Sequence, residues 1–281
     1  MSLFLEFLAG GLANAITSAI LNPLDIAKTR MQTAASPLPL RSTLLALHAQ
    51  GGLQAVFLPG MAASVCREMV YSGAKAGLYV PLRNFFSGGG EGSAGASAGG
   101  KVAAALCTGT LGSLAANPID VVKVRLMADA AAYPSTLGAL PSIYRAEGLA
   151  GLYRGLLPST LRGACVSAGE LATYDVVKGG LKEALFAGQD GVPLHVAASL
   201  VTGCVAACVA APFDLLKSRA MSSTGGQESM SSVLRQLARE GALPFGLFRG
   251  LVPAYLRLGP HALIAFPIFE QLRAAFGLEY L

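Results

Sequence analysis

The sequence predicts an all-α membrane protein made of three tandem repeats, each with two transmembrane helices and one short surface helix. The composition is 53% apolar and only 13% charged, and the mean hydropathy of +0.55 is too high for an ordinary soluble domain. An eight-residue motif also occurs three times, starting at residues 23, 118 and 212. Finally, a long apolar segment precedes each copy and another follows it.

The repeated motif has the form Pro-x-Asp-x-x-Lys-x-Arg, and it defines the repeat boundaries. It runs from Pro23 to Arg30, from Pro118 to Arg125 and from Pro212 to Arg219. Self-similarity at a fixed period marks copies of one structural unit. We therefore expect repeats at residues 1–90, 91–186 and 187–281, with six spanning helices in three pairs and both termini on one side of the membrane.

The first apolar segment of each repeat ends at the motif proline. In repeat 1 it runs from Leu3 to Asn22, and at about 1.5 Å per residue it crosses most of a ~30 Å bilayer core. Small residues four apart, such as Gly10 and Asn14, let helices approach closely in lipid. Proline removes a backbone donor and clashes with the preceding turn, so we expect a kink at each motif.

Later elements of each repeat follow the same order. Amphipathic stretches that fit helices on the membrane surface are Thr43–Gln50, Thr136–Glu147 and Ser229–Glu240. After a glycine signal, the second apolar segments are Met61–Leu82, Leu156–Val177 and Leu251–Leu272. The stretch from Ser87 to Gly100 is rich in Gly, Ser and Ala and predicts a linker.

The glycine signals also predict lipid contacts. Tyr153-Arg154-Gly155 and Phe248-Arg249-Gly250 each offer an interfacial ring, a cation and the N–H groups of a helix start, which together suit a lipid phosphate. Repeat 1 has Leu58-Pro59-Gly60, which lacks the ring and the cation, so the prediction is weakest there.

The motif places an acid and a base three residues apart at the end of each first helix. The pairs are Asp25 and Lys28, Asp120 and Lys123, and Asp214 and Lys217. They could be local surface pairs worth about 0.3–0.5 kcal/mol each, or a ring in which each Asp binds the Lys of a neighbouring repeat and closes a central pathway. Charges within membrane helices are costly unless they face a polar interior, which favours the ring. Gln32, one turn after Lys28, could brace it.

A second, less complete set of charged residues lies at the far ends of the second helices. It consists of Arg83, Asp175, Lys178, Glu270 and Arg273. Val80 stands in repeat 1 where the other repeats have an acid, so at most two of three bonds between repeats can form there. A strong gate and a weak gate at opposite ends are typical of alternating access.

Each second helix also carries one arginine, namely Arg67, Arg162 or Arg257. Each lies 12 residues before its aromatic-led motif, which starts at Tyr79, Tyr174 or Phe269, so all three should lie about 18 Å from that end. An arginine at such depth costs about 2.5–3.5 kcal/mol, so three at one level indicate a shared site. Guanidinium groups match carboxylate, phosphate or sulfate oxygens bidentately, which predicts an anionic cargo.

Four other polar residues are candidates for the same site. Lys75 and Glu170 each lie eight residues after their arginine and could pair across helices or hold substrate charge. Glu68 could offset the charge of Arg67 or accept a substrate amine. His261, one turn after Arg257, could move a proton with the anion, although a buried, hydrogen-bonded histidine is the more ordinary role.

Several function classes are disfavoured. The 21 Lys and Arg residues sit singly and not in the basic stripe that nucleic acid requires. No Ser-His-Asp set, metal-ligand cluster or phosphate-binding glycine loop occurs, so we expect no enzyme activity, no catalytic residue, no metal and no cofactor. Five cysteines in apolar segments are interpreted as packing residues. Without a signal or transit pattern at the start, we expect targeting information inside the chain.

Over essentially its whole length the chain resembles the mitochondrial carrier family, on the strength of the three Pro-x-Asp-x-x-Lys-x-Arg motifs. The resemblance implies a six-helix barrel with pseudo-threefold symmetry in the mitochondrial inner membrane, loaded at one central site between two gates. It also implies that the motif prolines face the matrix, that cardiolipin binds at the glycine-led helix starts, and that the three arginines contact substrate.

Within that family, three segments are similar to the dicarboxylate, oxoglutarate and uncoupling-protein branch. They are Arg162-Gly163-Ala164, the stretch from Gly169 to Asp175, and the stretch from Arg257 to His261. The stretch from Cys66 to Ser72 is also similar to a dicarboxylate carrier, but Glu68 stands where that branch commonly has Gln.

The expected function is exchange of small dianions, such as malate, succinate or oxoglutarate, with each other or with phosphate or sulfate. We expect a functional monomer whose partners are small anions and membrane lipid. Two alternatives are an uncoupling-type proton leak regulated by nucleotides, and an aspartate or glutamate carrier. A scaffold without transport activity would need neither the three arginines nor a complete Asp-Lys ring.

Overall fold

The computed structural model describes residues 2–34, 38–86, 98–133, 135–184, 192–223, 230–239 and 243–277. Regular structure within these ranges is helical throughout, as the sequence predicted. Repeat 1 contains α1 (Ser2–Ile20), α2 (Asn22–Thr33), α3 (Leu40–Phe57) and α4 (Met61–Phe86). Repeat 2 contains α5 (Ala98–Ala128), α6 (Thr136–Leu152) and α7 (Leu156–Ala184). Repeat 3 contains α8 (Val192–Ser222), α9 (Met230–Arg239), the 3₁₀ turn η1 (Phe245–Phe248) and α10 (Leu251–Ala275).

The motif prolines interrupt the first helices to different degrees. In repeat 1 the helix breaks at Leu21, and Pro23 then occupies the first turn of α2, where a missing backbone donor costs nothing. In α5 and α8 the assigned helix continues through Pro118 and Pro212. At the predicted kink sites, one helix ends and another begins in repeat 1, whereas in repeats 2 and 3 one helix continues through the proline. The predicted linker at Ser87–Gly100 lies mostly outside the described residues, and α5 begins at Ala98.

The three short helices each bury one edge against the motif of their own repeat. Their buried residues lie four apart, on one helix face, at Thr43 and Leu47, Ala139 and Ile143, and Val233 and Leu237. Leu47 packs on Ile26 of α2, and Leu237 packs with Leu215 of α8. The predicted amphipathic helices are therefore confirmed as helices that support the motif from outside.

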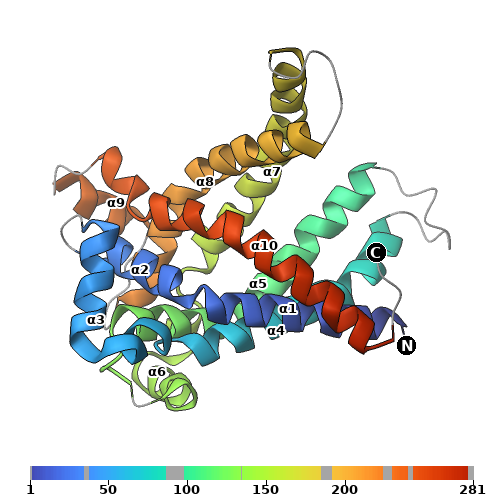
Figure 1. The fold of residues 1–281 in the computed structure, drawn as a ribbon. Helices are drawn as coiled ribbons and strands as arrows, with labels where there is room; N and C mark the ends of the chain where they lie inside the picture. The colour runs from blue at the N-terminus through green and yellow to red at the C-terminus, as the bar shows by residue number, and fades with distance from the viewer. Residues whose placement is uncertain are drawn as a thin grey trace.

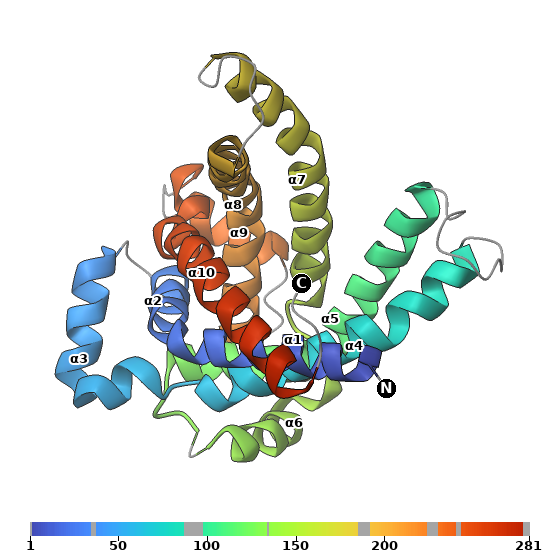
Figure 2. The same cartoon turned by 45° about the vertical axis from the view of Figure 1, so that its right-hand side comes forward.

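The six long helices that the structure describes contact one another in a closed cycle, and α5 also contacts α8. Helix α1 contacts α4 and α10, α5 contacts α4 and α7, and α8 contacts α7 and α10 (Figure 1). At their far ends the α4–α5 pair and the α7–α8 pair point apart in both views (Figures 1 and 2). At the other end the three motifs converge. The molecule is thus closed where the prolines lie, and these two pairs diverge at the opposite end.

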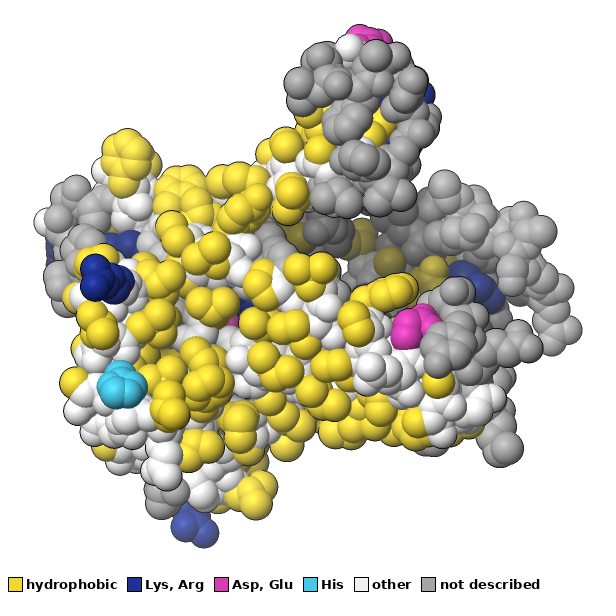
Figure 3. Space-filling model, viewed as in Figure 1, with side chains coloured by type: hydrophobic (Ala, Val, Ile, Leu, Met, Phe, Trp, Pro, Cys, Tyr) yellow, Lys and Arg dark blue, Asp and Glu magenta, His cyan; other side chains and the backbone are white. Residues whose placement is uncertain are grey.

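Apolar side chains cover much of the outer face formed by α1 and α10 (Figure 3). Exposed examples are Ile16, Ile20, Leu256, Leu263 and Phe266. Among the described residues, one segment, Ala197–Ser222, has the length and hydropathy (1.8) of a membrane span, and a shorter apolar helix covers Leu8–Ile20. Six spanning helices thus remain a prediction based on the repeat.

The cysteine prediction was wrong at two positions. Cys66 and Cys204 are exposed, whereas the other three thiols are partly buried. A helix with an apolar outer face does not need to bury a small apolar side chain, which explains why composition misled here.

Candidate functional site

Three ion pairs join the motif ends of α2, α5 and α8. Lys28 Nζ lies 2.6 Å from Asp214 Oδ2, Lys123 Nζ lies 3.0 Å from Asp25 Oδ2, and Lys217 Nζ lies 2.7 Å from Asp120 Oδ2. Every pair joins different repeats, so the pairs that the ring hypothesis requires are present and the local-pair alternative is not what the structure adopts. We call these six residues the gate ring.

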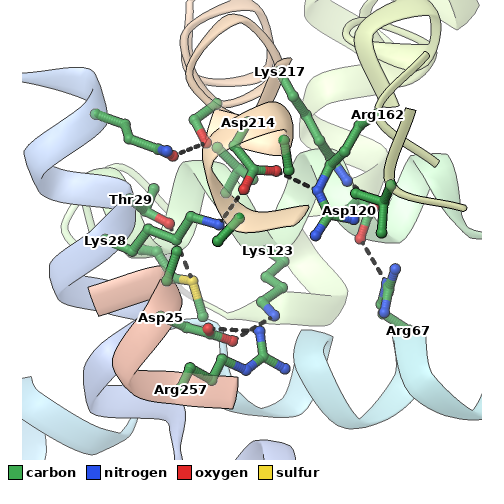
Figure 4. Close-up of a pocket in the computed structure, with 18 of the residues that line it drawn as sticks. Asp25, Lys28, Thr29, Arg67, Asp120, Lys123, Arg162, Asp214, Lys217 and Arg257 are labelled. Atoms are coloured by element: carbon green, nitrogen blue, oxygen red, sulfur yellow. Dashed lines mark hydrogen bonds and ion pairs between the residues drawn. The ribbon is translucent and has the colours of Figure 1, made fainter. Parts of the chain in front are cut away.

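Each gate carboxylate also binds one of the three arginines (Figure 4). Arg67 Nε lies 3.2 Å from Asp120 Oδ1, Arg257 Nη1 lies 2.7 Å from Asp25 Oδ1, and Arg162 Nε contacts Asp214 Oδ1. The lysine uses one carboxylate oxygen and the arginine uses the other. Because the two cations come from the two other repeats, each aspartate joins all three repeats.

This contact shows that the arginines, at the depth that we expected, lie within reach of the gate ring. Each arginine also lies seven residues after the glycine that starts its helix, at Gly60, Gly155 or Gly250, which is about 10 Å from the proline end. A long side chain at that height reaches the gate ring. Counting residues from the aromatic motif gives the same position along the helix, but only counting from the glycine shows that each arginine can reach a gate aspartate.

The gate ring and the arginines line one open cavity of about 460 Å³. This volume falls within the usual range of small-molecule sites. Among the predicted site residues described by the structure, the cavity lining contains Asp25, Lys28, Gln32, Arg67, Glu68, Asp120, Lys123, Arg162, Asp214, Lys217, Arg257 and His261. The structure therefore brings the predicted substrate residues and the predicted gate together in one place.

Glu68 and His261 differ in what they contact. The carboxylate of Glu68 is buried, and its Oε1 accepts a hydrogen bond of 2.7 Å from Arg67 Nη1. The guanidinium of Arg67 also lies over the ring of Tyr71, 4.8 Å from its centroid. His261 lines the same cavity. Of the two roles considered for Glu68, the geometry matches the offset of arginine charge.

Gln32 has a partner that we did not expect. Its Oε1 accepts a hydrogen bond of 2.6 Å from Ser218 Oγ, and its backbone carbonyl accepts one of 3.1 Å from Arg219 Nε. The side chain is almost fully buried. Gln32 thus joins repeats 1 and 3 beside Lys217, and the predicted bracing of the gate would act through Ser218.

The last arginine of each motif forms a second set of links that the sequence reasoning missed. Arg30, Arg125 and Arg219 each donate from Nε to a backbone carbonyl of the next repeat, at Met127, Met221 and Gln32, over 3.3, 3.0 and 3.1 Å. Arg125 also forms two 2.8 Å bonds with Glu147 of α6. The signal was present, because the arginine recurs in all three motifs.

The glycines before the second helices also have a threefold role. Gly60, Gly155 and Gly250 adopt φ values of +68°, +71° and +83°, which disfavour residues with a side chain. A Cβ added at Gly155 would lie 2.8 Å from Met221 Cγ, and one at Gly250 would lie 3.0 Å from Gln32 Cγ. These glycines therefore let neighbouring repeats approach closely at the gate.

The predicted far-end gate can be placed only in part. Arg83 donates to its neighbour Asn84 over 3.3 Å, and Arg273 is buried with its guanidinium 5.7 Å from the Phe269 ring centroid. Lys178 and Glu270 lie on α7 and α10 at that end. The side chains of Lys75, Glu170 and Asp175 lie outside the described part of the chain.

The arginines of the expected lipid sites bind protein atoms. Arg154 Nη1 lies 2.8 Å from the carbonyl oxygen of Ser223 and 3.0 Å from Glu147 Oε2. Arg249 Nη1 lies 3.4 Å from the carbonyl oxygen of Ala34. Both side chains reach into the next repeat, so they contribute to contacts between repeats.

Comparison with known proteins gives consistent matches over the whole chain. The model of the mitochondrial carrier protein family matches residues 1–90, 95–185 and 188–279. Mitochondrial citrate transporter F of Aspergillus niger is 32% identical over 97% of this chain and 90% of its own length. Mitochondrial brown fat uncoupling protein 1 of Ovis aries is 33% identical (95% and 90%), and dicarboxylate carrier UCP2 of Danio rerio is 31% identical (96% and 91%).

Proposed function

Because this chain belongs to the mitochondrial carrier family, a family of transporters of the mitochondrial inner membrane, we propose that it exchanges small dianions across that membrane by alternating access. The cargo class comprises dicarboxylates such as malate, succinate or oxoglutarate, and phosphate or sulfate. We also propose that the long helices form a six-helix barrel with pseudo-threefold symmetry around the cavity. The cyclic order of helix contacts supports this arrangement.

The observation that carries the proposal is the sharing of each gate carboxylate between a lysine and an arginine. In the empty carrier the arginines bind Asp25, Asp120 and Asp214, which are the same anions that hold the gate lysines. An incoming carboxylate or phosphate offers the arginines the same kind of oxygen. When the cargo replaces an aspartate on its arginine, the gate loses one of its contacts between repeats and the closed state loses stability.

In this scheme the proline end faces the matrix and is closed, and the diverging end faces the intermembrane space. Cargo enters from the diverging side and binds Arg67, Arg162 and Arg257. The closed and open states interconvert because the cargo binds the intermediate conformation between them more tightly than it binds either end state. The set formed by Arg83, Asp175, Lys178, Glu270 and Arg273 closes the opposite side.

Reconstitution in liposomes tests the proposal directly. Labelled malate, phosphate and aspartate are offered outside, with or without unlabelled anion inside. The proposal expects uptake of the dianions that depends on the internal anion. Uptake that is equally fast into empty liposomes would overturn exchange as the mechanism.

The same assay separates two alternatives from this proposal. A proton leak is suggested by the similarity to uncoupling protein 1, and would appear as fatty-acid-dependent proton flux without anion exchange. An aspartate or glutamate carrier would need Glu68 for the substrate amine, whereas Glu68 is bonded to Arg67. Preferential uptake of aspartate would favour an aspartate or glutamate carrier over the proposed dianion exchanger.

We further propose that the carrier works as a monomer with cardiolipin bound at the starts of α4, α7 and α10. Helix starts present backbone N–H groups without intrahelical partners, which suit a phosphate. The phosphate would rely on these groups, since Arg154 and Arg249 already bind neighbouring backbone. Addition of cardiolipin to delipidated protein should raise its Tm, and an equal rise with phosphatidylcholine would argue against a specific site.

A further inference from the structure

The charges that line the cavity do not cancel. Six cations, three from lysine and three from arginine, face four carboxylates, three from aspartate and one from Glu68, which leaves a charge of +2 with His261 neutral. Lys75 and Glu170 lie outside the described side chains, and their formal charges cancel each other. The cavity charge therefore matches a dianion.

Glu68 is the residue that breaks the threefold pattern of this charge. The positions related to it by the repeat hold Gly163 and Leu258, which carry no charge. Without Glu68, each repeat would contribute one Asp, one Lys and one Arg to the described cavity lining, and the charge of that lining would be +3. A single acid in repeat 1 thus decides whether the cavity suits two or three negative charges.

The geometry shows which arginine Glu68 neutralises. Arg67 contacts two carboxylates, at 2.7 Å from Glu68 Oε1 and 3.2 Å from Asp120 Oδ1. For Arg162 and Arg257, the ion pair within the cavity is with one aspartate each. When a cargo displaces the aspartates, Arg67 meets it with its charge offset by Glu68, whereas Arg162 and Arg257 meet its anionic groups with full charges.

We propose that Glu68 sets the valence of the cargo, so that the cavity prefers a dianion over a trianion of similar size. This inference rests on the proposed anion exchange and adds to it the basis of its charge selectivity. Among charged side chains that are largely buried, one unmatched charge is expensive, because the interaction between charges is screened less than in bulk water. Glu68 acts through Arg67 and the total charge, and it does not need to contact the cargo.

The test compares labelled malate with labelled citrate at neutral pH, where the first is a dianion and the second a trianion. In proteoliposomes the wild-type carrier should prefer malate. Glu68→Gln removes the charge but keeps the size, and it should raise the citrate-to-malate ratio of kcat/KM about tenfold or more, mainly through a lower KM for citrate. Glu68→Asp keeps the charge and should retain the malate preference.

Moving the acid to another repeat separates total charge from local structure. Gly163 occupies the related position in repeat 2, where an added Cβ would meet no atom within 4 Å, so the start of a glutamate side chain has room. The double variant Glu68→Gln, Gly163→Glu restores a cavity charge of +2 and should restore the malate preference. The inference is overturned if Glu68→Gln lowers malate and citrate exchange equally. It is also overturned if the double variant keeps the raised citrate-to-malate ratio of the single variant.

The same experiment distinguishes failure of the inference from failure of the proposed function. If the wild-type carrier exchanges malate but Glu68→Gln leaves the citrate-to-malate ratio unchanged, only the role of Glu68 is overturned. If that variant instead loses aspartate uptake at an unchanged ratio, Glu68 binds a substrate amine. If the wild-type carrier exchanges none of the labelled anions, the proposed function fails, and the inference fails with it.

Discussion

The substitution Asp120→Asn tests the shared carboxylate most directly. Asp120 is buried, with Lys217 Nζ at 2.7 Å from Oδ2 and Arg67 Nε at 3.2 Å from Oδ1. Asparagine keeps the shape but removes the charge, so two cations lose their anion. Removal of one partner from a buried ion pair costs about 3–5 kcal/mol. The Lys217 and Arg67 side chains keep 17% and 26% exposure, so the lower part of that range applies here.

A loss of about 3 kcal/mol shifts the balance between closed and open states by about 150-fold. It should also lower the Tm by about 6 °C or more, given about 2–4 °C per kcal/mol for chains of 150–250 residues. Thermal unfolding in detergent and exchange in liposomes measure the two effects. Asp129→Asn is a control for the loss of an exposed carboxylate outside the gate ring, because Asp129 is exposed and accepts a hydrogen bond from the nearby backbone amide of Ala131.

A charge swap distinguishes the shared carboxylate from a simple ring. If Asp120 bound only Lys217, the double variant Asp120→Lys, Lys217→Asp would restore the pair and recover stability. With Arg67 bound to the same carboxylate, the swap places a lysine against Arg67, and stability should stay low. Full recovery of Tm and exchange in the swapped variant would refute our reasoning.

Three further outcomes follow from the contacts described above. Arg162→Gln should reduce dianion exchange at least a hundredfold while the Tm changes by only a few degrees. Exchange at the wild-type rate would show that this arginine does not bind the cargo. Arg125→Lys should lower stability by about 3 kcal/mol, since lysine cannot reproduce five bonds from a buried guanidinium. Arg145→Lys on the exposed face of α6 is the control for thermal unfolding. Gly155→Ala should destabilise the protein more than Gly148→Ala. Both positions have positive φ, but only at Gly155 would the new Cβ meet atoms of the neighbouring repeat. Equal losses of Tm in the two variants would assign the effect to backbone strain alone.

Much of the fold follows from the sequence because the repeat shows each element three times. A short helix that is ambiguous alone, such as α9, becomes clear when Thr136–Glu147 occupies the same place in the previous unit. The details that the repeat does not fix were less predictable. Proline separates two helices only at Pro23, since the backbone around Pro118 stays helical. Whether a thiol such as Cys66 is exposed depends on which face meets lipid, and composition does not encode that.

The candidate site was predicted as two separate layers, and the structure joins them. The motif spacing identified Asp25 and Lys123 as gate residues, and the depth of Arg257 along its apolar segment identified it as an anion ligand. Their contact through one carboxylate depends on how far a side chain reaches between helices of different repeats, which spacing along one helix cannot reveal. The backbone contacts of Arg125 were missed for the same reason, because their partners are carbonyl groups of another repeat.

The shared carboxylates make gate strength and cargo affinity two aspects of one equilibrium. By linkage, whatever stabilises Arg162 on Asp214 must weaken cargo binding to that arginine by the same factor. An empty carrier keeps all three arginines on the gate and so stays closed, whereas a dianion can relieve Arg162 and Arg257 together. Each charge-assisted hydrogen bond is worth about 1.5–3 kcal/mol, so two of them supply about 3–6 kcal/mol. That is comparable with the ~5.5 kcal/mol needed to turn a 1:99 population into 99:1. If the proposed exchange holds, a monoanion would relieve only one arginine and fall short, which is a physical reason to expect a preference for dianions.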